Sequence, residues 1–348
     1  MAETILGVDF GYDSLKLALV NGKQVKKSAI VPMPKNLIKE GRIVSAETMA
    51  ELLRKTAKSS GITCKNAALA LTNETVFVKS VSAPQMIHDQ LLYNLPYEFR
   101  DYITDELKDY IYDYAMINNS VKSDDAPAPA NPEEEGAEAK EHMELLAAAV
   151  PKAAMEEYKL SFKKAGMKLV SAAPAVSSYI SLIRNMDPAL RPATNEYCIL
   201  DLGYKEIRMF LFKGDVNTTS RTLEVGLSII DDVISENYNV DVHLAHTYLL
   251  SNYDDCQNKD FCINSFNNIS VELMRAMNFY RFSNPDSQLA DIWVCGGGAV
   301  IKSLTDSIKE TLDLNIHDAA ELVQDGDKIE NCNSLILAIG AAMNKGGR

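Results

Sequence analysis

Two stretches of the sequence place a glycine two residues after an aspartate, between apolar segments, and such a pattern can hold a phosphate group and its counter-ion. The first contains Asp9 and Gly11, and the second contains Asp201 and Gly203. The apolar residues on either side predict a β-hairpin with its aspartate at the tip. One such stretch is also consistent with an ordinary turn, because glycine and aspartate favour turns for local reasons. The second copy indicates two similar half-molecules.

A third element of this kind lies late in the chain. Residues 291–295 predict a strand that runs into Gly296, Gly297 and Gly298 and then into a helix. Glycines let backbone N–H groups approach a phosphate or a purine, and the N-terminus of a helix adds a favourable dipole. The three elements in this order indicate a nucleotide cleft more strongly than any one of them alone.

This order resembles the actin-like ATPase superfamily, in which two phosphate hairpins face each other across a cleft and a glycine-rich turn closes its base side. Within it, the chain resembles the PilM family of type IV pilus assembly, and the resemblance covers nearly the whole chain. It implies an α/β fold of two ribonuclease-H-like lobes with an inserted subdomain of the 1C type. Further segments that carry the resemblance are residues 81–84, 92–103, 110–117, 145–152, 162–167, 271–280 and 335–342.

The resemblance implies a cleft that binds ATP or ADP with magnesium. Asp9 and Asp201 would contact the metal, mostly through waters, as suits a cation that keeps part of its hydration shell. Lys16 would reach a phosphate or remain a solvated strand residue, and Ser14 would line the turn or only bond within it. Glu272 and Arg275 would face the nucleoside or form a surface ion pair. The remaining nucleotide-binding positions are Gly11, Tyr12, Gly203, Tyr204, Gly226, Gly296, Gly297 and Gly298.

Several positions depart from the pattern of the superfamily. Ile207 stands where the second hairpin usually carries a hydroxyl, and Glu224 places a carboxylate near the phosphates if it points inward. Ala173 and Ala175 stand where relatives commonly have acidic residues. Hydrolysis needs a side chain that orients or deprotonates the attacking water, and we find no candidate for it. We therefore expect ATP turnover that is slow or absent.

Composition limits the classes of partner and compartment. The 348 residues carry a net charge of -13 and a pI near 4.9, which argues against nucleic acid or anionic lipid as the main partner. No apolar stretch is long enough to span a membrane and no signal peptide is recognisable. We expect a cytoplasmic protein that reaches the inner face of the cytoplasmic membrane only through a partner. The six scattered cysteines indicate reduced core residues.

Strand and helix signals alternate along most of the chain, and two stretches in which this alternation is interrupted predict the domain boundaries. Residues 1–78 and 145–192 form the first lobe, with a strand at 145–150 that returns to it. Residues 79–144 form the 1C-type insertion, in which the Pro-, Ala- and Glu-rich segment 120–141 predicts a disordered loop. Residues 193–226 and 289–348 form the second lobe, and the mostly helical stretch 227–288 is its inserted part.

The insertion is rich in tyrosine, which could form its core or line a peptide groove. The residues concerned are Tyr93, Tyr97, Tyr102, Tyr110 and Tyr112. Resemblance to the PilM family implies a scaffold that grips the N-terminal cytosolic peptide of a PilN-like inner-membrane protein, and the pilus motor ATPase is a further candidate partner.

Two other functions compete with the scaffold. An FtsA-like division tether would carry a C-terminal amphipathic helix, which residues 341–348 do not form, and an actin-fold sugar kinase would need an aspartate base in the cleft. His243 and His246 have a spacing that can bind a metal, but no third ligand is near them in sequence.

Overall fold

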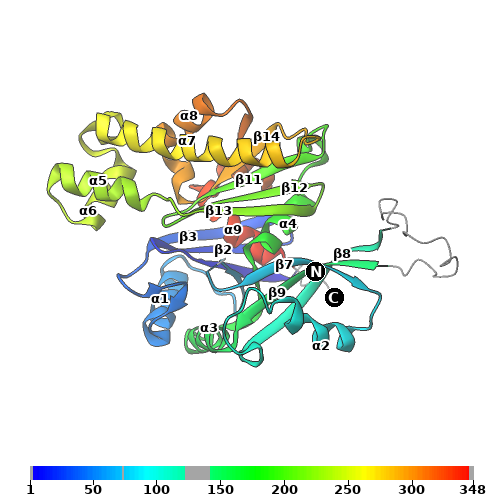
Figure 1. The fold of residues 1–348 in the computed structure, drawn as a ribbon. Helices are drawn as coiled ribbons and strands as arrows, with labels where there is room; N and C mark the ends of the chain where they lie inside the picture. Colours follow the sequence, from blue (N-terminus) through cyan, green and yellow to red (C-terminus); the bar gives the residue numbers. More distant parts are fainter. Residues whose placement is uncertain (1–2, 73, 122–141, 345–348) are drawn as a thin grey trace.

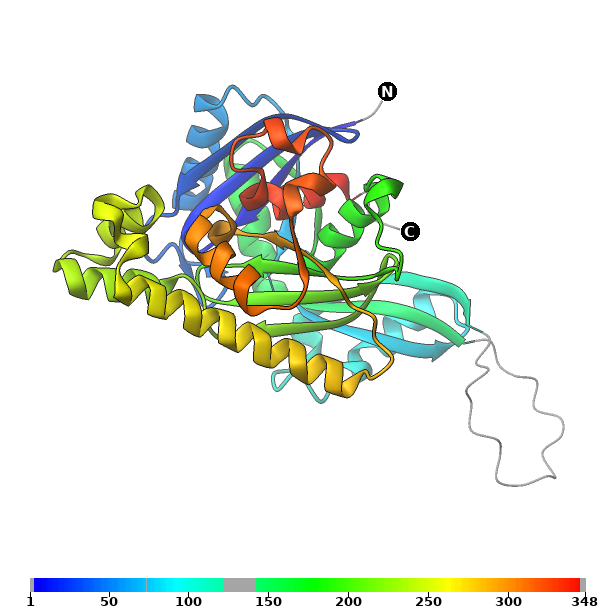
Figure 2. The same ribbon diagram turned by 90° about the horizontal axis from the view of Figure 1, so that it is seen from above.

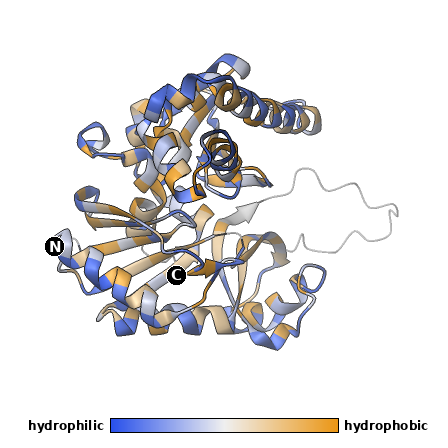
Figure 3. Ribbon diagram, turned by 90° about the vertical axis from the view of Figure 1, so that its left-hand side faces the viewer, coloured by the Kyte–Doolittle hydropathy of each residue, from blue (hydrophilic) through white to orange (hydrophobic). Residues whose placement is uncertain are grey.

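The computed structural model describes residues 3–72, 74–121 and 142–344, and at residues 118–121 it describes the backbone only. Two five-stranded sheets form the two halves of the molecule, and Figure 1 shows them one above the other with α4 and α9 between them. Figure 3 shows hydrophobic and hydrophilic residues mixed along the helices, as expected for helices with one buried face.

The first sheet has the strand order β10-β6-β1-β2-β3. Strands β1, β2 and β3 are antiparallel neighbours, whereas β1, β6 and β10 run parallel to one another. Helices α1 and α3 pack together, and α1 begins where the Ser45 side chain accepts from the Thr48 amide. The bounds are β1 Thr4–Phe10, β2 Ser14–Asn21, β3 Gln24–Pro32, β6 Asn66–Leu71, β10 Lys168–Pro174, α1 Ala46–Ser59 and α3 Lys152–Lys164.

The second sheet repeats this arrangement in the order β13-β12-β11-β14-β15. Its first three strands are antiparallel, and β11, β14 and β15 are parallel. The predicted pair of hairpins is therefore confirmed as β1–β2 and β11–β12, at matching places in two sheets of the same topology. The bounds are β11 Glu196–Leu202, β12 Ile207–Lys213, β13 Val216–Leu223, β14 Asp291–Cys295 and β15 Asn315–Asp318.

Helices α4 (Ala175–Asn185) and α9 (Cys332–Met343) form a core with side chains from both sheets. The packing is close enough to require glycine. A Cβ at Gly7 of β1 would lie 1.8 Å from the carbonyl oxygen of Ala338, and one at Gly340 would lie 2.4 Å from that of Ser178. Helix α9 thus contacts β1 and α4 directly, although residues 332–343 were expected in the second lobe.

The insertion has its own sheet, in the order β7-β9-β8. The strand expected to return to the first lobe at 145–150 is part of β9 and pairs with β7 on one side and β8 on the other. Its alternate side chains Met143, Leu145, Ala147 and Ala149 pack into the core that α2 covers, so the strand stays in this sheet. Beyond residue 121, the segment predicted to be disordered lies outside the described residues. The bounds are β7 Phe77–Pro84, α2 His88–Glu98, β8 Tyr110–Val121 and β9 His142–Pro151.

Helices dominate residues 227–284, as predicted, and Figure 2 shows the long helix α7 extending along the second half of the molecule. In the described part of the chain no helix is both long and apolar enough to cross a membrane. The remaining helices and strands are β4 Ile38–Lys39, β5 Arg42–Ile43, α5 Ser228–Tyr238, α6 Val242–Ser251, α7 Asp260–Ser283 and α8 Lys302–Thr311. Short 3-10 helices lie at Leu107–Asp109, Pro188–Leu190, Tyr253–Asn258, Gly297–Val300, Ala319–Leu322 and Gly326–Lys328.

Candidate functional site

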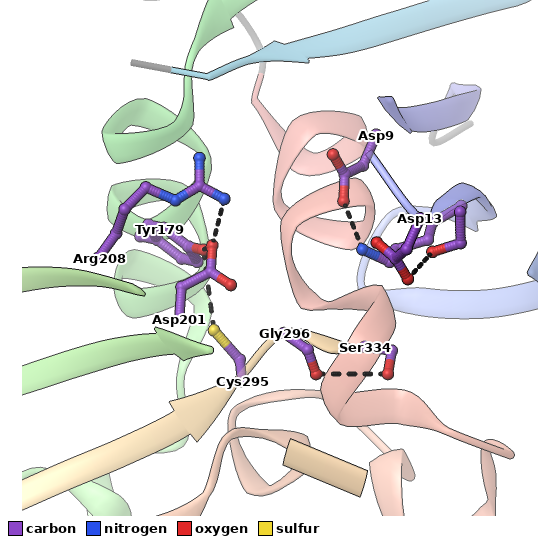
Figure 4. A network of polar contacts seen from close by, with 10 residues as sticks. Asp9, Asp13, Tyr179, Asp201, Arg208, Cys295, Gly296 and Ser334 are labelled. Carbon is purple, nitrogen blue, oxygen red and sulfur yellow. Dashed lines mark hydrogen bonds and ion pairs between the residues drawn. The ribbon is translucent and has the colours of Figure 1, made fainter. Parts of the chain in front are cut away.

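The two hairpins and the glycine-rich turn line one cleft, as the sequence predicts. Figure 4 shows Asp9 from the first hairpin and Asp201 from the second, with Gly296 and Ser334 nearby. The predicted residues that line the cleft are Asp9, Gly11, Tyr12, Lys16, Asp201, Gly203, Tyr204, Gly296 and Gly297. Backbone N–H groups of the turns and the Lys16 ammonium are donors that could hold phosphate oxygens.

In the first hairpin, Lys16 lies directly opposite Asp9 across the β1–β2 pair. Its Nζ is 3.3 Å from Asp9 Oδ2, and both side chains are buried, so Lys16 is not a solvated strand residue. Burial raises the pKa of Asp9, and the charge of Lys16 opposes that rise. Ser14 donates to Asp13 Oδ2 at 2.9 Å and does not line the cleft, so it bonds within its own turn.

Tyr12 is fixed to the wall of the first lobe. Its hydroxyl donates to the carboxylate of Glu74 and accepts from the amide of Gly41 at 2.9 Å. Burial and the bond to Glu74 raise the pKa of Tyr12, so its hydroxyl stays protonated near neutral pH. Tyr12 therefore acts as a structural link between the hairpin and the loop at 41.

The second hairpin carries a cation that the sequence analysis missed. Arg208 lies opposite Asp201 across the β11–β12 pair, and its Nη2 is 2.9 Å from Asp201 Oδ2. Tyr179 of α4 donates to the same oxygen at 2.8 Å, and Cys295 Sγ lies 3.7 Å from the Tyr179 hydroxyl (Figure 4). Burial raises the pKa of the Cys295 thiol well above its usual value, which makes it an unreactive core group.

Besides Ser14, four predicted residues do not line the cleft. Glu272 and Arg275 form an ion pair on the exposed face of α7, because Leu273, Ala276 and Met277 hold the opposite face of this helix in the core. Their surface alternative is thus the correct one. Gly226 packs against the backbone of Tyr204 and Gly298 packs against Leu202. Glu224 is exposed and does not line the cleft, and Ile207 is buried in the core of the second lobe.

The tyrosines of the insertion divide into two groups. Tyr110 is buried in the core beneath α2, and Tyr112 packs against the same core with its hydroxyl bonded to the carbonyl of Leu107 at 2.8 Å. Tyr93, Tyr97 and Tyr102 are 73%, 53% and 57% exposed. Tyr110 and Tyr112 therefore have the core role, and the exposed Tyr93, Tyr97 and Tyr102 stay candidates for the predicted peptide groove.

A histidine–aspartate pair lies beside Tyr204 of the second hairpin's turn. His246 Nδ1 is 2.9 Å from Asp231 Oδ2, and its ring meets the ring of Tyr204 edge to face. His243 is exposed on the same helix. Among the described residues, no three histidine, cysteine or acidic side chains come together in a way that could hold a metal ion.

The sequence matches the family model of the type IV pilus assembly protein PilM over residues 7–345. The chain belongs to the PilM family. A solved PilM-PilN type IV pilus biogenesis complex is similar over 98% of this chain and 98% of that one, with 20% identity and a TM-score of 0.76. The ethanolamine utilization protein EutJ from Carboxydothermus hydrogenoformans covers 99% of this chain and 90% of its own, with 13% identity and a TM-score of 0.59. No curated protein matches the sequence. The predicted PilM family and actin-like fold class are confirmed.

Proposed function

We propose that this chain is a scaffold of type IV pilus assembly that binds the N-terminal cytosolic segment of a PilN-like inner-membrane protein. Its family model spans residues 7–345, and the solved PilM-PilN complex is similar over 98% of both chains, which is the observation that carries the proposal. The scaffold works in the cytoplasm, beside the membrane that anchors its partner. The family match favours neither the division tether nor the sugar kinase.

The exposed tyrosines of the inserted subdomain are the surface to which we assign the segment. Tyr93 and Tyr97 lie on α2 with their ring centroids 6.3 Å apart. The guanidinium of Arg100 lies 5.3 Å from the Tyr97 ring, and Lys79 Nζ lies 5.5 Å from the Tyr102 ring. Exposed tyrosine rings supply a large amphipathic contact area at a low cost in side-chain entropy, which suits the binding of an extended peptide.

Charge also supports a partner of this kind. Cytosolic segments next to a membrane span are rich in lysine and arginine. This chain carries a net charge of -13. A basic segment would therefore be drawn to the scaffold, and its affinity would fall as salt screens the attraction.

The cleft binds ATP or ADP in this proposal and thereby sets the angle between the lobes. Lys16 and the two glycine-containing turns supply the donors for phosphate oxygens. Asp9 and Asp201 are both held in ion pairs with cations, so nucleotide acts in this proposal as a ligand that is turned over slowly or not at all.

Calorimetry with a synthetic copy of the partner's cytosolic segment tests the proposal. We expect the full chain to bind it, and the double variant Tyr93→Ala, Tyr97→Ala to bind about tenfold more weakly or worse. Phe282→Ala is the matched control, because Phe282 is an aromatic residue that is 87% exposed on α7, away from α2. A wild-type chain that does not bind the segment would overturn the proposed function, and equal losses in both variants would overturn the assigned surface.

A further inference from the structure

One oxygen of the Asp201 carboxylate already accepts from two donors within the chain. Its Oδ2 accepts from Arg208 Nη2 at 2.9 Å and from the Tyr179 hydroxyl at 2.8 Å. Its Oδ1 lies close to the glycine-rich turn, because a Cβ at Gly296 would be 2.4 Å from it. Magnesium held through waters needs carboxylate oxygens that are free to accept from those waters. The second hairpin therefore does not fit the part in metal binding that resemblance to the superfamily implies for Asp201.

Arg208 has donors that nothing in the described part of the chain uses. The residue is 8% exposed, and its Nε and Nη1 are buried without a hydrogen-bond partner. Glu206 Oε1 lies 3.7 Å from Nε, too far for a hydrogen bond. Buried N–H groups without acceptors are costly, and a ligand with several acceptor oxygens would satisfy them.

The guanidinium lies at the cleft, beside the turn of the second hairpin. Arg208 lines the cleft, and its Nη2 is 3.9 Å from the place where a Cβ on Gly203 would be. Lys16 lies beside the glycine of the first turn in the same way, because its Nζ is 3.3 Å from the place where a Cβ on Gly11 would be. Each hairpin thus holds a cation beside the glycine of its own phosphate turn. The planar fork of an arginine matches phosphate oxygens closely.

The two cations also balance the two aspartates. Lys16 pairs with Asp9 and Arg208 pairs with Asp201, so two positive charges face two negative ones at the centre of the cleft. In a cleft without Arg208, a metal ion would have to supply the missing charge before phosphates could approach. The other acidic residues that line the cleft are Asp13, which accepts from Ser14, Glu74, which accepts from Tyr12, and Glu206, which lies 3.7 Å from Arg208.

We propose that Arg208 takes the place of the divalent cation in this cleft, so that the diphosphate or triphosphate group of a nucleotide binds without a metal ion. This inference rests on the proposed function in one respect only, namely that the cleft binds nucleotide. Asp201 positions Arg208 by pairing with one end of its guanidinium, and on nucleotide binding the guanidinium turns so that its buried Nε and Nη1 meet the phosphate oxygens.

The test is calorimetry of the full chain with ADP and ATP, once with magnesium and once with EDTA. We expect the wild-type affinity to differ by less than about threefold between the two conditions. Arg208→Gln should weaken binding in EDTA by about tenfold or more, whereas the matched control Arg221→Gln, an exposed arginine on the neighbouring strand β13, should not. Asp201→Asn should tighten binding in EDTA, because it removes a negative charge beside the phosphates while its amide oxygen can still accept from Nη2 and hold Arg208 in place.

Three outcomes would overturn the inference. They are a wild-type affinity about a hundredfold lower in EDTA, a loss of magnesium-dependent binding in Asp201→Asn, and no binding of nucleotide under either condition. If Arg208→Gln fails to fold because it leaves Asp201 buried and unpaired, the double variant Arg208→Gln, Asp201→Asn removes both charges and decides the question by the same loss of binding in EDTA. The titration with the partner's segment is carried out without nucleotide. Failure of this inference and failure of the scaffold proposal are therefore distinguishable.

Discussion

Tyr179 donates a hydrogen bond of 2.8 Å to Oδ2 of Asp201, and this bond ties the helix between the two sheets to the tip of the second hairpin. Both groups are buried, so water cannot replace the bond if it is lost. A bond to a charged acceptor in such a place contributes more than an exposed one.

Tyr179→Phe should therefore lower the free energy of unfolding by about 1.5 to 3 kcal/mol. Urea denaturation followed by circular dichroism measures the change. Tyr97→Phe, which removes the hydroxyl of a tyrosine that is 53% exposed, is the control and should change stability by no more than about 0.5 kcal/mol. Equal stability of Tyr179→Phe and the wild type would show that the bond contributes nothing to the fold.

Gly340 is required by the closeness of α9 to α4. A methyl group there would lie 2.4 Å from the Ser178 carbonyl oxygen, so Gly340→Ala should destabilise the fold by about 1 to 3 kcal/mol or more. Gly297→Ala is the matched control, because its new methyl would meet only ordinary contacts at 3.7 and 3.9 Å. Thermal melts of the two variants should separate them clearly, and similar melting temperatures would contradict the close packing.

The His246–Asp231 pair should make stability depend on pH. Burial lowers the pKa of His246, but the hydrogen bond and charge of Asp231 outweigh it and raise the pKa above 6.5. Because the folded-state pKa is the higher one, protonated His246 stabilises the fold below the unfolded-state pKa, and this contribution is lost as the pH rises through the folded-state pKa. His246→Gln should consequently cost more stability near about pH 6 than near about pH 9.

Denaturant titrations at both pH values measure this difference. His243→Gln, a change at an exposed position on the same helix, is the control and should show no such dependence. A cost for His246→Gln that is the same at both pH values would mean that the pair does not titrate in this range.

ATP turnover should be slower than about one per second, below the usual range of enzymes. Ala173 and Ala175 carry no group that could orient a water, and the described cleft offers Asp9 and Asp201 only in ion pairs with cations. A phosphate-release assay with purified full chain checks this, and turnover in the enzyme range would contradict the assignment as a scaffold.

The phosphate hairpins can be predicted from the sequence because their signals are local. In each copy the aspartate and the glycine are only two positions apart, at Asp9 and Gly11 and at Asp201 and Gly203. Alternating apolar residues indicate the strands beside them. Arg208 could have been predicted too. It follows Asp201 by seven residues, as Lys16 follows Asp9, and in both hairpins that spacing places the cation opposite the aspartate.

Other parts of the site depend on tertiary contacts that spacing does not express. Tyr179 lies 22 positions before Asp201, and nothing in its own neighbourhood indicates the bond between them. The three-residue separation of Glu272 and Arg275 suits a surface ion pair as well as a ligand site, and only the packing of α7 decides between them. The alternation along β9 likewise fits either sheet, so its partners could not be predicted from the strand alone.

The position of α9 has a consequence for how the protein is made. Residues 332–343 cover β1 and β2, which leave the ribosome long before the helix does. At about 5 to 20 residues per second, the inner face of these strands waits on the order of tens of seconds for the helix that buries it. During synthesis the nascent chain thus exposes apolar side chains of this sheet. We expect it to be a substrate for chaperones that cover such surfaces until α9 has been translated.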